Sequence, residues 1–81
     1  MNRVTLYTKP QCSLCDDVMD VIEQAKATVA FDLELRNILD NSADYDRYKH
    51  DIPVVLLNGV EIARHRLALP RLLAALQESR G

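Results

Sequence analysis

The chain has 81 residues, a formal net charge of −2 and a hydrophobic content of 48%, so we expect residues 1–81 to form a single folded domain. A negative charge argues against generic binding to nucleic acids or anionic membranes, and no apolar run approaches the ~20 residues of a membrane-spanning helix. Strand-like sequence begins at once, without the apolar segment of a signal peptide, so we expect a cytoplasmic protein.

The first part of the chain predicts a strand, a helix and a second strand. Residues 4–7 are β-branched or aromatic and predict a short strand. Pro10 then interrupts the chain, and a helix is predicted over Ser13–Lys26 from an apolar stripe formed by Leu14, Val18, Ile22 and Ala25. Alternation over Phe31–Leu35 predicts the second strand. A helix of this length connects parallel strands, so we expect the first two strands to be parallel.

A short helix and a buried strand are predicted next. After a break at residues 37–41, either Asn41 or Ser42 can cap a short helix that ends near Tyr48. The run Val54–Leu57 is continuously aliphatic, which is typical of a strand that is buried on both faces.

A hairpin and a last helix complete the predicted elements. Asn58-Gly59 is a strong hairpin signal, since both positions tolerate positive φ, and Val60–Ala63 is the returning strand. Pro70 suits the first turn of a helix whose apolar face comprises Leu69, Leu72, Leu73 and Leu76. The predicted order is therefore β-α-β-α-β-β-α.

The only two cysteines, Cys12 and Cys15, lie at the start of the first predicted helix. The free N–H groups and the positive end of that helix stabilise a thiolate at Cys12, and Lys9 precedes it by three residues. Cys15 lies one helical turn further on, within reach of a disulfide. Asp16 and Asp17 oppose the thiolate but favour the helix. This arrangement suits thiol–disulfide exchange, in which an exposed thiolate attacks and a second, covered thiol resolves.

Other uses of the cysteine pair stay open. Two buried, inert cysteines are one alternative. A structural zinc site needs about four ligands, for which the chain offers the two cysteines, His50 and His65. Cys12 from two chains can also hold an iron–sulfur cluster. The domain can finally serve as a thiol sensor or binding module without efficient catalysis.

Ile52-Pro53 opens the third predicted strand. Proline suits the first residue of a strand because it has no N–H to donate. The Ile52–Pro53 bond can be an ordinary trans bond, or cis at modest cost. A cis bond beside the cysteines would turn the Ile52 backbone outward, where its N–H and C=O pair with an extended substrate.

Residues 7–15 (YTKPQCSLC) and 52–59 (IPVVLLNG) resemble the glutaredoxin family, and the likeness covers nearly the whole chain. A small glutaredoxin-like group, whose sequences read CxLC followed by an acid, is the closer match. The resemblance implies a thioredoxin-like α/β fold, with a four-stranded mixed sheet in the order 2-1-3-4 and three helices on its two faces.

The resemblance also implies roles for individual residues. Cys12 would be the nucleophile and Cys15 the resolving cysteine. Lys9 would meet the glycyl carboxylate of glutathione. Pro53 would be a cis proline, with Ile52 offering backbone hydrogen bonds to the cysteinyl part of glutathione. Glutathione is then a co-substrate, and we expect no tightly bound cofactor and no metal.

Two segments depart from the glutaredoxin pattern. Ser13 and Leu14 stand where glutaredoxins usually carry Pro-Tyr, and we expect them to shape the site. Residues 62–66 replace the usual Gly-Gly pair and include Arg64-His65-Arg66, which forms either an anion or partner patch or a solvated loop. We expect a monomeric dithiol–disulfide oxidoreductase that acts on a disulfide-containing protein or a small thiol, with glutathione or a thioredoxin-type reductant.

Overall fold

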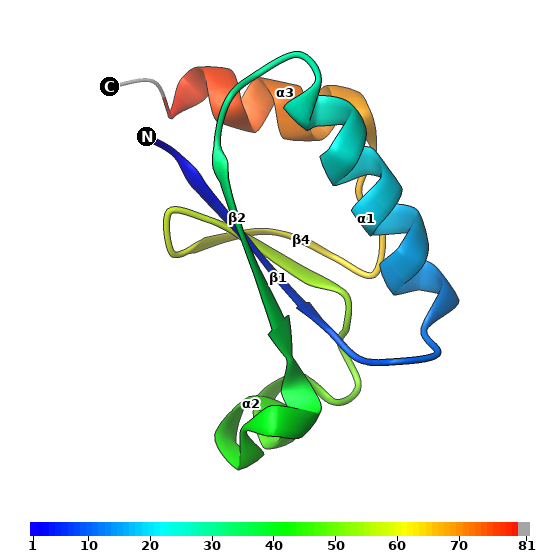
Figure 1. Cartoon of the computed structure of the whole chain (residues 1–81). Coiled ribbons are helices and arrows are strands. Elements are labelled where there is room, and N and C mark those ends of the chain that lie inside the picture. The colour runs from blue at the N-terminus through cyan, green and yellow to red at the C-terminus, as the bar shows by residue number, and fades with distance from the viewer. Residues whose placement is uncertain (80–81) are drawn as a thin grey trace.

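The computed structural model of the chain describes residues 1–79, and the last two residues of the expected single domain lie outside the described residues. Figure 1 shows the secondary-structure elements in chain order. They are β1 (Arg3–Thr8), α1 (Ser13–Lys26), β2 (Asp32–Asn37), a short 3-10 helix η1 (Ile38–Asp40), α2 (Ser42–Tyr48), β3 (Val54–Leu57), β4 (Val60–Arg64) and α3 (Leu69–Glu78).

The strands form one mixed sheet in the order β2-β1-β3-β4, as predicted. β1 runs parallel to β2 and antiparallel to β3, and β3 runs antiparallel to β4. The register sets Val4 opposite Leu33 and Leu6 opposite Leu35. Because side chains alternate along a strand, these residues point to one face of the sheet.

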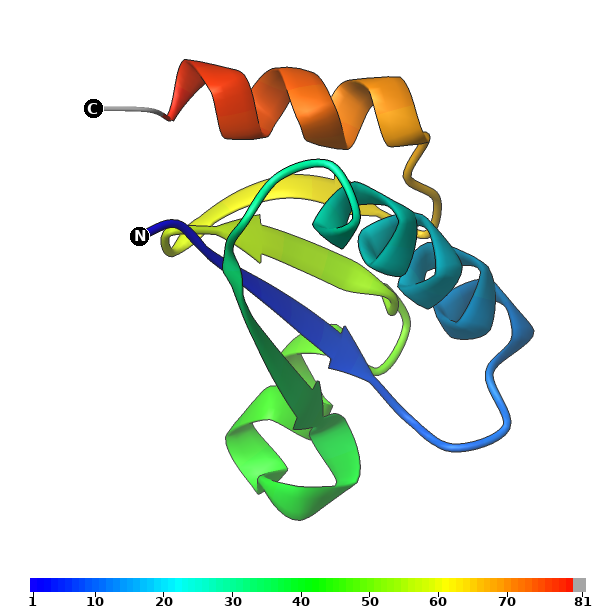
Figure 2. The same ribbon diagram turned by 45° about the horizontal axis from the view of Figure 1, so that its top comes forward.

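Two helices cover that face. Figures 1 and 2 show α1 and α3 side by side against the sheet, and their apolar stripes meet the side chains of Val4 and Leu6 in one core. Ile22 from α1 and Leu72 from α3 are completely buried there. The apolar spacing therefore predicted most of both buried faces. Leu14, however, is half-buried and lies outside this core, and the buried Ala75 was not predicted.

The third helix lies on the opposite face, at the end of the sheet where β2 stops. The ring of Tyr48 in α2 packs on Tyr7, with 4.4 Å between ring centroids, and Tyr7 points away from the face of Leu6. Helices therefore flank both faces, as the predicted fold class requires. A second apolar cluster forms here and contains Cys15, Ile38, Tyr48, Ile52 and Val54.

Strand ends differ from the predictions. β2 starts at Asp32 and continues to Asn37, whereas Phe31 precedes the strand and is buried in the core. Pairing with β1 extends β2 in a way that apolar alternation does not reveal. η1 occupies the predicted break, where the Asn37 side chain accepts a hydrogen bond of 2.9 Å from the N–H of Leu39. β1 and β4 also run slightly beyond their predicted ends.

The predicted hairpin and the other helix boundaries are confirmed. Asn58 and Gly59 have φ of +51° and +86°, the backbone of a turn that matches the twist of the paired strands. The Asn41 side chain caps α2, and Pro70 lies in the first turn of α3. No helix within residues 1–79 combines the length and apolar character needed to cross a membrane.

Candidate active site

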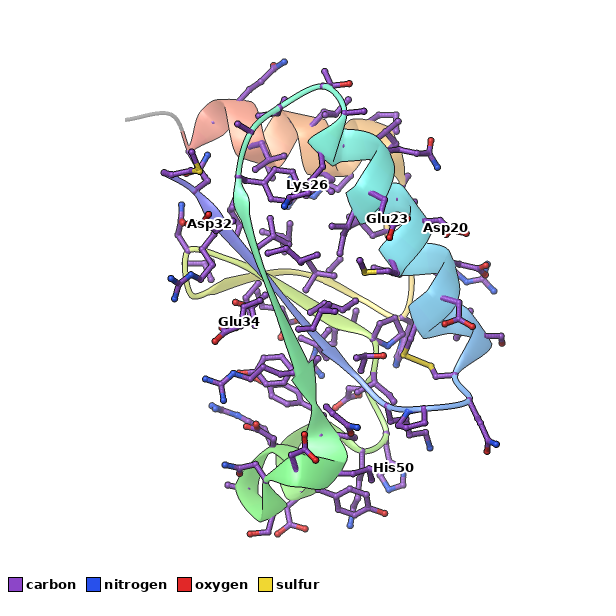
Figure 3. All side chains as sticks on the ribbon, in the orientation of Figure 1. Asp20, Glu23, Lys26, Asp32, Glu34 and His50 are labelled. Atoms are coloured by element: carbon purple, nitrogen blue, oxygen red, sulfur yellow. A yellow bond between two sulfur atoms is a disulfide. The ribbon has the colours of Figure 1, made fainter. Side chains whose placement is uncertain are left out.

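Cys12 and Cys15 form a disulfide at the N-terminus of α1. Figure 3 draws it as a yellow bond at the start of that helix. Cys12 is the N-cap residue, with an extended backbone, and its Sγ accepts a hydrogen bond of 3.2 Å from the backbone N–H of Cys15. Cys12 thus occupies the position that Ser or Asp takes in many helices. A helix N–H aimed at sulfur stabilises negative charge on that sulfur.

The two cysteines differ in exposure. Cys12 is half-buried, whereas Cys15 is 3% exposed and packs in the cluster of Ile52 and Val54. Cys12 is therefore the more accessible of the two residues. This arrangement matches the expected division between an attacking and a resolving thiol.

The loop that delivers Cys12 has an unusual backbone. Gln11, directly before Cys12, has a φ of +59°, a region that residues with a side chain seldom adopt. Lys9 precedes it and is exposed, as is Ser13 at the first helical position. The structure thus places both of these predicted site residues on the open surface beside Cys12 in the chain. The sequence carried no signal for the conformation of Gln11, because glutamine has no preference for positive φ.

The second predicted site element lies against the cysteines. The Ile52–Pro53 peptide bond is cis, as the resemblance implies. Ile52 shares the apolar cluster of Cys15, and Cys12 packs at its edge. The structure therefore brings Cys12, Cys15, Ile52 and Pro53 together. The Pro53 side chain is fully buried, so it shapes the loop from inside.

The backbone of Ile52 is only partly available to a substrate. Its N–H donates a hydrogen bond of 3.1 Å to the C=O of Tyr48, at the end of α2. Sequence reasoning assigned both the N–H and the C=O of Ile52 to a substrate, without foreseeing that the last turn of α2 would engage the N–H. The C=O of Ile52 is left as the candidate contact.

Arg64 and His65 hold the segment that leads into Pro53. Arg64 Nη1 lies 3.1 Å from a carboxylate oxygen of Asp51. The ring of His65 lies 4.0 Å from Asp51 and 3.4 Å from the C=O of His50, which Figure 3 labels in the loop between α2 and β3. The His65 N–H also donates to the C=O of Pro53 at 2.7 Å. Arg64 and His65 thus contact the segment that precedes β3, although all three residues of the triplet are exposed.

The triplet turns sharply at His65. The N–H of Arg66 donates to the C=O of Arg64 at 2.7 Å, and His65 between them has a φ of +66°. This is a γ-turn of the rare, strained kind. It directs the chain from β4 back toward the first turns of α1.

A groove of 260 Å³ lies where this turn meets α1. Leu14, the residue between the cysteines, forms part of its wall, and Arg66 lines the other side. The full lining comprises Leu14, Asp17, Val18, Val21, His65, Arg66, Leu67 and Ala68. Sequence reasoning named Leu14, and gave Arg64-His65-Arg66 as either an anion or partner patch or a solvated loop. It missed that residues 65–68 pack against α1, because no local pattern shows it.

Two titratable groups near the site have perturbed pKa values. Burial raises the pKa of the Tyr7 phenol, and the nearby Asp44 carboxylate raises it further, so Tyr7 stays neutral beside Tyr48. Hydrogen bonds of 2.6 and 3.0 Å from Arg64 hold the pKa of the Glu61 carboxyl below its usual range. Glu61 and Asp51 therefore both present carboxylates to Arg64.

The alternative of a zinc site was based on the cysteines, His50 and His65. Within residues 1–79, no three or more His, Cys, Asp and Glu side chains are grouped so as to hold a metal ion.

Comparison with known proteins shows the family. Residues 3–77 match the glutaredoxin-like domain family (DUF836). The glutaredoxin-like protein YDR286C homolog of Dictyostelium discoideum is 30% identical over 70 residues. That match covers 79% of this chain and spans only 65% of the length of the relative.

Solved structures are similar to this chain in fold. The X-ray structure of protein XcR50 from X. campestris is similar over 94% of this chain and 97% of that one, with a TM-score of 0.77 and 30% identity. Thioredoxin 1 from Thermosipho africanus is similar over 94% of this chain and 91% of its own, with a TM-score of 0.66. Its identity of 16% shows a shared fold alone. The chain therefore has the thioredoxin fold and belongs to the glutaredoxin-like domain family.

Proposed function

We propose that this chain is a dithiol–disulfide oxidoreductase of the glutaredoxin-like type. One observation carries the proposal: Sγ of the half-buried Cys12 accepts a hydrogen bond of 3.2 Å from the backbone N–H of Cys15, and Cys15 itself is buried and bonded to Cys12. Such an arrangement supplies an activated attacking sulfur and a protected second thiol. The disulfide in the structure corresponds to the oxidised state of this couple.

The first step forms a mixed disulfide between the protein and the substrate. In the reduced protein, the Cys12 thiolate attacks one sulfur of a substrate disulfide. A bond forms between Cys12 Sγ and that sulfur, while the substrate S–S bond breaks. The departing sulfur leaves as a thiolate and takes a proton from solvent. Because the helix N-terminus stabilises negative charge at Cys12, it favours the attacking thiolate over the thiol.

The second step restores the protein disulfide. Cys15 loses its proton and attacks Cys12 Sγ, so the Cys12–Cys15 bond forms and the mixed disulfide breaks. The substrate then leaves as a second thiolate and is protonated. In sum, the substrate disulfide gains two electrons from the two cysteines, which are oxidised to the Cys12–Cys15 disulfide. It also gains two protons, one given up by Cys15 through solvent and one taken from solvent. A dithiol or two thiols, from a thioredoxin-type reductant or glutathione, return the protein to its reduced state by the reverse exchange.

Substrate contacts surround Cys12. The C=O of Ile52 is directed by the cis bond to Pro53 and can accept a hydrogen bond from an extended substrate. Lys9 is exposed on the approach loop and can meet a carboxylate such as that of glutathione. Ser13 and Leu14 separate the two cysteines in the chain, and Ser13 is exposed whereas Leu14 is half-buried.

The proposal is tested by turnover with excess reductant. The protein is supplied with glutathione or with a thioredoxin-type dithiol, and the reduction of a small disulfide and of a protein disulfide is followed. We expect turnover by the wild type and none by Cys12→Ser. Equal rates for both proteins, or no turnover with either reductant, would contradict an oxidoreductase. The latter result would favour a thiol sensor.

A further inference from the structure

We propose that the groove beside Leu14 binds an apolar side chain of a protein substrate, next to the cysteine that reacts with Cys12. The preferred substrate is then a peptide disulfide with a neighbouring Leu, Ile or Met, rather than glutathione disulfide. This inference rests on the proposed oxidoreductase function, which it makes more specific.

The wall of the groove is mainly aliphatic. α1 contributes Leu14, Val18 and Val21, and the segment before α3 contributes Leu67 and Ala68. Its volume of 260 Å³ lies below the ~300–1,000 Å³ of sites that enclose whole small ligands. The groove thus suits one side chain, and an apolar one gains most from leaving water there.

The charged residues at the groove suit a peptide backbone. Asp17 lies on α1 and Arg66 on the opposite wall. Neither forms an ion pair with another residue of the described part of the chain. A peptide carries both groups that these side chains need: its N–H can donate to Asp17, and its C=O can accept from Arg66. An inserted side chain would therefore have complementary polar groups on both sides.

The groove continues directly into the reactive site. Leu14 is the neighbour of Cys15 and lies one residue beyond Ser13, so the groove starts within the first turn that carries both sulfurs. On the other wall, His65 is tied through its N–H to the C=O of Pro53. A peptide bound covalently to Cys12 therefore lies beside the groove. Glutathione carries no large apolar side chain, so it gains less from burial in this groove than a peptide with Leu, Ile or Met.

The first measurement compares matched peptide disulfides. Each substrate is a symmetrical disulfide of a short Gly-rich peptide with one cysteine, carrying either Leu or Ser near the cysteine, and glutathione disulfide is the third substrate. We expect kcat/KM for the Leu peptide to exceed that of the Ser peptide by roughly tenfold or more, the range for apolar groups in a specificity pocket. Equal values for the two peptides, or a preference for glutathione disulfide, would overturn the inference while leaving the oxidoreductase function intact.

A variant pair assigns the preference to the groove. Ala68 lines the groove, is exposed, and is the N-cap of α3 without a side-chain cap. Ala68→Asp adds a cap that favours folding and places a charge in the apolar groove. Ala74→Asp, on an exposed site of the same helix, is the matched control. We expect Ala68→Asp to lose the preference for Leu and Ala74→Asp to keep it. If Ala68→Asp kept the preference for the Leu peptide, the inference would be overturned.

A binding readout separates this inference from the proposed function. The Leu and Ser peptides, with their cysteine replaced by serine, are titrated into the oxidised protein and followed by amide NMR shifts. With the Leu peptide, we expect shifts at Leu14, Val21 and Ala68. We expect the Ser peptide to bind with an affinity that is roughly tenfold lower. Failure of all turnover would overturn the oxidoreductase function alone. Absence of the shifts would overturn the groove inference, whatever the turnover.

Discussion

The backbone N–H of Cys15 donates a hydrogen bond of 3.2 Å to Sγ of Cys12. One residue therefore stabilises charge on the attacking sulfur through its backbone and supplies the resolving thiol through its side chain. The N-cap position of Cys12 makes this possible, because the residue three positions into a helix has a free N–H.

This hydrogen bond predicts an acidic thiol at Cys12. We expect Cys12 in the reduced protein to ionise below the ~8.5 of free cysteine, whereas Cys15, in its apolar cluster, ionises above that value. The rate of alkylation as a function of pH measures the pKa values of both thiols, and the variants Cys12→Ser and Cys15→Ser assign each value to its cysteine. Ionisation of Cys12 at or above the value for free cysteine would show that the helix end does not activate it.

The first-turn carboxylate of Asp16 opposes this activation while favouring the helix. Asp16→Asn should lower the pH at which Cys12 ionises by less than about one unit, and should lower the free energy of unfolding by ~0.3–1 kcal/mol. The control is Asp20→Asn, since Figure 3 places Asp20 further along the outer side of α1. An unchanged ionisation in Asp16→Asn would show that solvent screens this carboxylate completely.

The pair of Glu61 and Arg64 predicts a pH dependence of stability. Because hydrogen bonds from Arg64 lower the pKa of folded Glu61, the pair stabilises the protein fully above the unfolded pKa of ~4.3. That contribution is lost as the pH falls through the folded pKa. Because both side chains are exposed, Glu61→Gln should cause only a small loss of stability at neutral pH. This loss should disappear in acid. Urea unfolding at several pH values measures it, and a loss that grows in acid would contradict the assignment.

The core that positions the site predicts a larger effect. Ile22 is completely buried between the sheet and α3, so Ile22→Ala should cost ~2–5 kcal/mol of unfolding free energy. A domain of 81 residues has ~4–12 kcal/mol in total. Val60→Ala is the control, since Val60 is 67% exposed and should cost less than ~0.5 kcal/mol. Similar denaturation midpoints for the two variants would contradict the burial of Ile22 in the core.

Local patterns in the sequence predicted most of the fold. The boundaries of α1 and β3, the cap at Asn41 and the turn at Asn58-Gly59 follow from apolar spacing and turn chemistry, which act over a few residues. The length of β2 was mispredicted because partner strands, rather than alternation, decide where pairing ends.

The site was predictable only in part for a similar reason. Cys12 and Cys15 are close in sequence, and Pro53 was linked to them through the resemblance. The ion pair between Arg64 and Asp51, and the groove between Leu14 and Arg66, join segments that are distant in the chain. Such contacts depend on how the loop after β4 turns at His65, and a positive φ at histidine has no sequence signal.

Trapping of the mixed disulfide tests the central role of Cys12 most directly. Reduced Cys15→Ser and reduced Cys12→Ser are each mixed with an excess of a peptide disulfide, and the intact mass is measured over time. We predict that Cys15→Ser rapidly gains the mass of one peptide and keeps it, because no resolving thiol remains, while Cys12→Ser reacts far more slowly. Equal labelling of the two variants, or faster labelling of Cys12→Ser, would contradict the assignment of Cys12 as the attacking residue.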